Sequence, residues 1–225
     1  MMTFRLALLV TSCLLVSQLQ AQDTQYMFLQ AGKLQLKDDN STIVSDGTTL
    51  SGEFDDLPFF AAGVQKVLGG DRFRYGYEGG GIISWQNDSV SYAARVNGGT
   101  QVAVKVDNEL FVFGTMLGGY GDIRFSDHVR LFASAGPMVL MASLDQEGDD
   151  PEGLSSSSVV VNTDERDFSF GYGAYGSVGL IISPSPKAEF GIVVREQDVE
   201  LDFSDAVADY PYDGTQYLLS FGYRM

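Results

Sequence analysis

The chain has 225 residues, of which 30 are acidic and 14 basic, and its formal net charge is −16. The length allows one large domain or two small ones, and the negative charge excludes a nucleic-acid-binding protein because phosphate backbones would be repelled. Beyond the N-terminus no apolar run approaches the ~18 to 20 residues of a membrane helix, which excludes a helical membrane protein. The 26 glycines and the 12% share of aromatic residues favour twisting strands over helices.

Residues 1–21 have the order of a cleavable secretory signal. Arg5 precedes an apolar run from Leu6 to Val16, and the small residue Ala21 supplies a cleavage position. We therefore expect a signal peptide at 1–21 and a single domain at 22–225. The only cysteine, Cys13, lies inside the apolar run, so an acylated lipoprotein cysteine is the weaker alternative. Cleavage after Ala21 would leave a mature chain without disulfides.

Period-2 alternation of apolar and polar residues dominates the rest of the chain. In the stretch RFRYGYEG, for example, Phe73, Tyr75 and Tyr77 share one face of an extended chain, whereas a helix would spread them around its axis. This pattern predicts eight strands, at about 25–37, 57–67, 72–85, 108–125, 129–143, 166–182, 188–200 and 214–225.

Short and long connections alternate between these segments. Three are tight and rich in turn-forming residues, at 68–71, 126–128 and 183–187. Four are long and polar, at about 38–56, 86–107, 144–165 and 201–213. This layout predicts an all-β fold, an eight-stranded antiparallel up-and-down transmembrane β-barrel with short periplasmic turns and long acidic extracellular loops. Closure into a ring follows because lipid offers no hydrogen-bond partner to a free sheet edge.

The alternative is a soluble eight-stranded barrel or a sandwich, with the apolar face turned inward. Glycine and charge are frequent on the face that such a protein would have to pack, which weighs against it. In the membrane barrel the aromatic face meets lipid, and the face rich in glycine, serine and charge meets the lumen.

The last strand carries a recognisable pattern, in which alternate residues are large and apolar up to the chain end. These residues are Tyr217, Leu219, Phe221, Tyr223 and Met225. The pattern resembles the terminal signature of Gram-negative outer-membrane β-barrels, although their usual last residue is aromatic. With the signal peptide and eight strands, the chain is similar to the small OmpA/OmpX-like barrels.

This resemblance implies a location in the cell outer membrane and contact with outer-membrane lipids and lipopolysaccharide. It also implies assembly by the barrel-assembly machinery, which would read the C-terminal strand, and a monomeric state.

The acidic residues are concentrated in the predicted loops. Segments 38–56, 86–109, 144–167 and 196–213 hold 24 of the 30 acidic residues and only three basic ones, Arg95, Lys105 and Arg166. We interpret this charge first as a solvated surface. The alternative is binding of divalent cations, which prefer carboxylate oxygens, but neither dense run follows the EF-hand spacing and no metal ligand is assigned.

Charged residues also fall on the predicted lumen face, mostly toward the periplasmic strand ends. Buried charges need partners, so we expect a network of paired charges that plugs the narrow lumen of an eight-stranded barrel. A narrow, anion-favouring pore is the alternative. The predicted network comprises Arg72, Arg74, Glu78, Asp122, Arg124, Arg130, Glu189 and Arg224.

Nothing in the sequence identifies a catalytic centre or a cofactor site. The single histidine, His128, falls in a predicted periplasmic turn beside Asp127, and the run Ser155 to Ser158 has the composition of a loop tip. We therefore expect a non-enzymatic, surface-exposed or structural envelope protein with acidic external loops. A small-solute pore is the second hypothesis, and a lipid-modifying outer-membrane enzyme is the third.

Overall fold

The computed structural model describes residues 25–37, 40–45, 48–53, 56–96, 100–148, 165–201 and 210–225. All the secondary structure in these ranges is β-strand. Nowhere in them is there a helix with the length and hydropathy needed to cross a membrane. The predicted signal segment 1–21, with Cys13, lies outside the described residues, as do 149–164 and 202–209, which make up much of two predicted loops.

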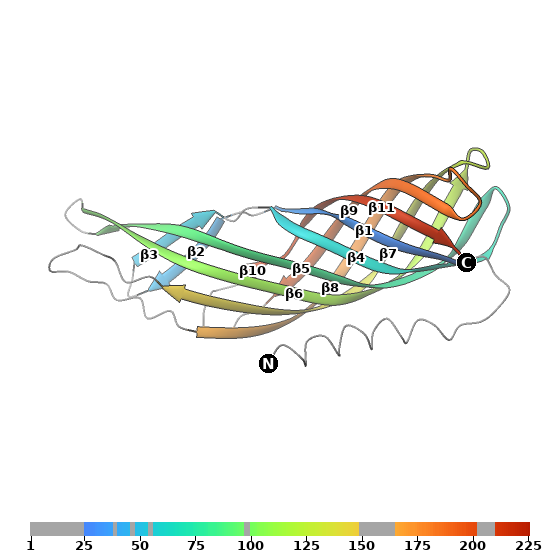
Figure 1. Ribbon diagram of the computed structural model, residues 1–225. Helices are drawn as coiled ribbons and strands as arrows, with labels where there is room; N and C mark the ends of the chain where they lie inside the picture. Colours follow the sequence, from blue (N-terminus) through green and yellow to red (C-terminus); the bar gives the residue numbers. More distant parts are fainter. Residues whose placement is uncertain are drawn as a thin grey trace, which may run out of the picture.

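Eight of the strands form a closed antiparallel barrel. Each pairs with its neighbour along the chain, and the ring closes because β1 pairs with both β4 and β11. This confirms the predicted eight-stranded barrel (Figure 1). The barrel strands are β1 (Gln25–Leu36), β4 (Leu57–Gly69), β5 (Phe73–Val96), β6 (Thr100–Arg124), β7 (Val129–Gly148), β8 (Glu165–Ile182), β9 (Ala188–Leu201) and β11 (Gly214–Arg224).

Three tight connections lie together at one end of the barrel, which we call the turn end. They join β4 to β5, β6 to β7 and β8 to β9, and the C-terminus lies at the same end (Figure 1). In the first of them Gly70 has a φ of 94°. A side chain there would be strained, because a Cβ would also lie 1.8 Å from the carbonyl oxygen of Phe73. The opposite end, where the longer connections leave the barrel, is the open end.

The strands are staggered around the ring. Starting at Phe190 of β9 and stepping from partner to partner through β11, β1, β4, β5, β6, β7 and β8, the path returns to β9 at Glu200. The return point is ten residues farther along the strand. Such a stagger tilts the strands against the barrel axis and leaves an interior that side chains can fill.

Strand pairing continues farther at the open end than the sequence predicts. Residues 86–107 were assigned to a loop because of their polar composition, but β5 and β6 stay paired through them, as far as Val96 and Thr100. Both arms keep the period-2 pattern, with Val90 and Tyr92 in one and Val102 and Val104 in the other.

The segment 38–56 also contains strands. It holds the hairpin β2 (Asn40–Ser45) and β3 (Thr48–Glu53), which pairs with β5 beyond the barrel ring (Figure 1). The two-residue strand β10 (Tyr210–Pro211) pairs with β9.

The outer face of the barrel is apolar and exposed. Its large side chains include Leu117, Ile192 and Leu219, which are 61%, 60% and 70% exposed. These exposed apolar side chains form a belt around the barrel, and the border of this belt toward the open end differs from strand to strand. On β9 the outward residues become acidic at Glu196, Asp198 and Glu200, all of which are exposed.

The neighbouring strand β8 keeps large aromatic side chains at the same height. Tyr172, which pairs with Glu200, is 78% exposed, and the next outward residues toward the open end are Phe170 and Phe168. The apolar belt therefore steps up between β9 and β8.

Gly136 marks a close approach between β7 and β6. A Cβ at this position would lie 2.0 Å from the carbonyl oxygen of Leu117 and 2.5 Å from the Cα of Gly118. We expect Gly136→Ala to lower the free energy of unfolding by about 1–3 kcal/mol, as for overpacked sites in general. Gly119→Ala is the matched control, since its Cβ would have nothing within 4 Å. Urea unfolding of the refolded variants measures both, and equal stabilities would contradict the predicted contact.

Candidate functional site: the barrel interior

The inward-facing side chains form three layers along the barrel. Nearest the turn end is the ion cluster, which consists of Arg74, Asp122, Arg130 and Glu189. Toward the open end follows the polar girdle, which consists of Gln30, Gln65, Glu78, Tyr175, Arg195 and Gln216. Beyond it is the apolar plug, which consists of Leu34, Leu57, Phe59, Leu110, Leu140, Leu144, Val199, Leu201 and Tyr212.

The ion cluster is a chain of four buried charges from four strands. Arg74 binds Asp122 through two hydrogen bonds, each 2.9 Å long, donated by Nε and Nη2. The Nη1 atom of Arg130 lies 3.5 Å from Asp122 Oδ2, and its Nη2 atom donates to Glu189 Oε2 at 2.6 Å. The four side chains are at most 8% exposed. Asp122 thus neutralises parts of two cations, and no charge of the cluster stands alone.

Tyr26 of β1 forms a platform under this cluster. Its hydroxyl accepts hydrogen bonds from Arg74 Nη1 at 2.6 Å and from Arg224 Nη2 at 2.7 Å. The guanidinium carbons of Arg74, Arg130 and Arg224 lie 5.4, 5.0 and 5.2 Å from the ring centroid. An aromatic face attracts cations, so the ring supplies part of the negative potential that three guanidinium groups require.

The eight residues of the predicted network are divided among three places. Arg74, Asp122, Arg130 and Glu189 meet in the ion cluster, and Arg224 joins them through Tyr26. Glu78 lies in the polar girdle instead.

Two of the predicted arginines lie apart from the buried charges. Arg124 pairs with the exposed Asp127 of its own turn at 3.2 Å. Arg72 was predicted to face inward but is exposed, because β5 begins only at Phe73 and Arg72 belongs to the turn.

The polar girdle surrounds Arg195, which is 1% exposed. Its Nη2 atom donates to Gln30 Oε1 at 2.5 Å and its Nη1 atom to Gln216 Oε1 at 3.2 Å. The guanidinium also lies over the rings of Phe59 and Tyr175, at 5.8 and 5.5 Å from the centroids. Dipoles and aromatic faces thus surround this cation on several sides.

Glu78 is the only carboxylate of the girdle as defined above, and two neutral donors hold it. Gln65 Nε2 donates to Oε2 and the Tyr175 hydroxyl donates to Oε1, both at 2.8 Å. Tyr175 therefore links the two charges of this layer, since its hydroxyl binds Glu78 while its ring faces Arg195. A hydrogen-bonded network of this kind is satisfied as a unit, so we expect its members to depend on one another.

The apolar plug corrects the expected character of the lumen. The inward face was predicted to be rich in glycine, serine and charge, but toward the open end large apolar side chains make up most of it. Leu34, Leu57, Leu140 and Leu201 are fully buried there. Gln197 closes the layer by donating to the carbonyl oxygen of Tyr212 at 2.9 Å. Burial also raises the pKa of the Tyr212 phenol above its usual range.

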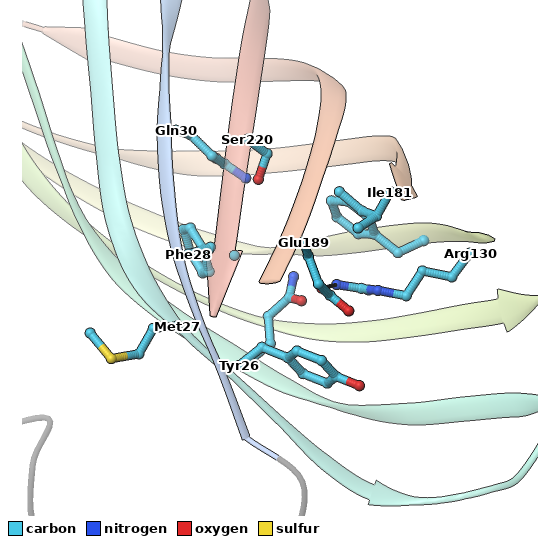
Figure 2. A pocket seen from close by; sticks show the side chains of 11 residues that line it. Tyr26, Met27, Phe28, Gln30, Arg130, Ile181, Glu189 and Ser220 are labelled. Carbon is cyan, nitrogen blue, oxygen red and sulfur yellow. Dashed lines mark hydrogen bonds and ion pairs between the residues drawn. The ribbon is translucent and has the colours of Figure 1, made fainter. Parts of the chain in front are cut away.

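Two cavities flank the ion cluster. The inner one, between the cluster and the polar girdle, measures about 10 Å³, close to the least that a single water molecule needs. Figure 2 shows Arg130 and Glu189 pointing toward each other across it, with Phe28 and Gln30 on the girdle side. The outer one, which we call the turn-end cavity, measures about 300 Å³. Arg74, Arg130 and Glu189 form its floor, and two of the tight turns form its wall.

Among the site residues that sequence reasoning did not single out are Tyr26, Arg195 and Tyr175. All three occupy inward positions of strands that the sequence did predict, so period-2 counting could have placed them. Arg195 is the most informative of them, because it is the one basic side chain among the inward residues of β9, which otherwise include Val193, Gln197 and Val199.

The described residues give no support for catalysis at the single histidine. His128 is exposed in the turn between β6 and β7, and its Nδ1 lies 3.0 Å from the carbonyl oxygen of Ser183. Within the described part of the chain no group of three or more His, Cys, Asp or Glu side chains is arranged to hold a metal ion. The serine run 155–158 lies outside the described residues.

Comparisons with known proteins place the fold among outer-membrane barrels. Neither protein-family models nor curated proteins gave a significant match. Among solved structures, the chain is similar to the outer membrane protein OprG of Pseudomonas aeruginosa, with 14% identity, coverage of 90% of this chain and 96% of that one, and a TM-score of 0.51.

Two further structures match with lower TM-scores. Ail, the attachment invasion locus protein of Yersinia pestis, has 13% identity, coverage of 91% of this chain and 100% of that one, and a TM-score of 0.47. The outer membrane protease OmpT of Escherichia coli has 11% identity, coverage of 90% of this chain and 91% of that one, and a TM-score of 0.42. At these identities the likeness concerns the fold alone, which is that of the eight-stranded outer-membrane barrels represented by OprG.

Proposed function

We propose that this protein is a non-enzymatic β-barrel of the bacterial outer membrane whose lumen is plugged and whose acidic open end faces the medium. The observation that carries the proposal is the distribution of polarity across the barrel wall. Large apolar side chains are exposed on the outside, with Leu219 at 70%, while Arg195 and Asp122 are buried inside at 1%. A barrel in water would be more stable with apolar side chains inside and charged side chains outside. A barrel in lipid requires an apolar outer face.

The proposed orientation puts the turn end in the periplasm. Short turns on the periplasmic side and longer loops outside are the usual arrangement in such barrels. The exposed acidic residues described at the open end, among them Glu109, Glu196, Asp198 and Glu200, would then lie at the cell surface beside lipopolysaccharide. We propose that divalent cations bridge these carboxylates to lipid phosphates.

We also propose that the barrel-assembly machinery reads β11. Its outward residues Tyr217, Leu219, Phe221, Tyr223 and Met225 are all 42% to 70% exposed, so they form one continuous apolar row on the outer face of this strand. β11 pairs with β1 in the closed ring, which makes this strand pair the last to form if the chain is threaded in order. We also propose a monomeric state, since the ring of strands closes within one chain.

The filled interior favours a plugged barrel over the rival small-solute pore. Reconstituted into planar lipid bilayers, the protein should give no steady ionic current under an applied voltage. The reason is that a solute entering the turn-end cavity meets the ion cluster, then a gap of about 10 Å³, then the apolar plug. A general porin measured in the same bilayers is the positive control. Stepwise, steady openings would contradict the plug and support the pore.

A lipid-modifying enzyme is the third hypothesis, and an assay of its own tests it. The refolded protein would be incubated with phospholipid, lipid A and ester substrates, and the products separated by mass. We expect no turnover above that of the heat-denatured protein. Turnover that disappears on substituting His128 would overturn the non-enzymatic proposal.

A further inference from the structure

We propose that the turn-end cavity binds a phosphate group. The cavity of about 300 Å³ falls within the ~300–1,000 Å³ range of small-molecule pockets and opens at the turn end. Four arginines line it, namely Arg74, Arg124, Arg130 and Arg224, against two carboxylates, Asp127 and Glu189. The lining is thus cationic in a protein whose net charge is −16.

Several arginine donors around this cavity are unused. Arg130 is 5% exposed, yet its Nε and Nη1 atoms have no hydrogen-bond partner, although Nη1 lies 3.5 Å from Asp122 Oδ2. The Nε atom of Arg224 is likewise buried without a partner. Buried N–H groups of charged side chains are seldom left unpaired. Burial removes their hydrogen bonds to water, and the free-energy cost is offset when another acceptor binds them.

The carboxylates that could satisfy these donors are already engaged. Glu189 accepts hydrogen bonds from Arg130 on one oxygen and from Ser183 on the other. Asp127 is bound by Arg124. In the described part of the chain, the Arg224 side chain makes one hydrogen bond, to the neutral Tyr26 hydroxyl, and forms no ion pair. With Asp122 included, four arginines therefore face three carboxylates, and each of these carboxylates is already paired with at least one arginine.

Phosphate matches this excess of arginines in charge and geometry. Guanidinium groups bind phosphate through paired, charge-assisted hydrogen bonds, and several oxygens of one phosphate can accept from different arginines. Two sources share this chemistry, namely a soluble phosphate monoester and the phosphodiester headgroup of a phospholipid. The turn-end cavity is open to either.

The test is calorimetric titration of the refolded full chain with sodium phosphate, in alkyl maltoside micelles that contain no phosphate and at constant ionic strength. We expect saturable binding to one site. Arg224→Gln removes a donor without breaking an ion pair and should weaken binding about tenfold, the loss typical of one charge-assisted hydrogen bond. Arg124→Gln, which disturbs only an exposed pair, is a second variant with the same expected direction.

Arg72→Gln is the matched control, since Arg72 is an exposed arginine at the same end and does not line the cavity. Its binding should change less than twofold. Heat-modifiability of migration shows that each variant has folded. Absence of saturable binding, or equal weakening by Arg72→Gln and Arg224→Gln, would overturn the proposal.

Glycerophosphoethanolamine, a headgroup without acyl chains, distinguishes the sources. Displacement of phosphate by this diester supports the site and identifies a lipid headgroup as its occupant, whereas binding of phosphate that the diester does not displace supports the site and identifies a soluble monoester.

Discussion

Asp122→Asn should lower the free energy of unfolding by about 3–5 kcal/mol, the range found when one partner of a buried ion pair is removed. The reason is that Asp122 is fully buried and lies between two cations. It accepts both hydrogen bonds from Arg74 and lies 3.5 Å from Arg130. An amide of the same shape leaves Arg74 without a countercharge, and its NH₂ group would face a guanidinium that also donates.

Urea titration of the protein refolded into lipid vesicles measures this loss. Asp127→Asn is the matched control, because its side chain is 93% exposed and its pair with Arg124 spans a single turn. Exposed pairs of this kind contribute only about 0–1 kcal/mol. A difference of less than about 1 kcal/mol between the two variants would show that the ion cluster is hydrated or differently paired.

Leu219→Arg should destabilise the folded barrel by about 2–4 kcal/mol in a bilayer, the cost of a lipid-facing cation near the midplane of a membrane barrel. Leu219 is 70% exposed and lies on β11 between the aromatic residues Tyr217 and Phe221. The same substitution on a soluble barrel would change stability by no more than about 0.5 kcal/mol, since an exposed leucine in water has little to lose. The variant therefore tests directly which solvent surrounds the wall.

Leu68→Arg is its control. Leu68 is similarly exposed, at 56%, but lies at the end of β4 beside the turn. Near the membrane interface the expected cost falls to about 0–1 kcal/mol. Urea unfolding in vesicles compares the two variants. A small and equal effect at both positions would contradict a membrane location, whatever the fold.

Period-2 alternation predicted the barrel strands well because it comes directly from strand geometry. The segment 188–200 coincides almost completely with β9, in which Glu189, Val193 and Arg195 are buried while Phe190 and Ile192 are exposed. The pattern also placed the three tight turns, since glycine, proline and serine gather there. Where strands extend beyond the barrel ring, as in 86–96, polar composition outweighed the pattern and the prediction was a loop.

The interior was harder to predict, for two physical reasons. At the open end both faces of a strand are apolar, as in Val139, Leu140 and Met141, so alternation no longer tells the plug from the wall. The polar girdle depends on contacts distant in sequence, since Arg195 and Gln30 are 165 residues apart. Arg72 was wrongly predicted to face inward because the period-2 pattern was extended one residue beyond the start of β5 at Phe73.

For the outer-membrane location proposed above, the step in the apolar belt determines how the barrel fits its bilayer. Asp198 and Glu200 end the belt early on β9, while Tyr172, Phe170 and Phe168 prolong it on β8. A rigid barrel whose apolar belt is taller on one side cannot match the uniform hydrocarbon thickness of a flat bilayer when its axis is parallel to the bilayer normal. In the proposed orientation, the barrel would tilt, or the bilayer at its open end would become thinner beside β9 and thicker beside β8. The bilayer surface would therefore lie at different levels beside these two strands, and the lipids around the barrel would not all be equivalent.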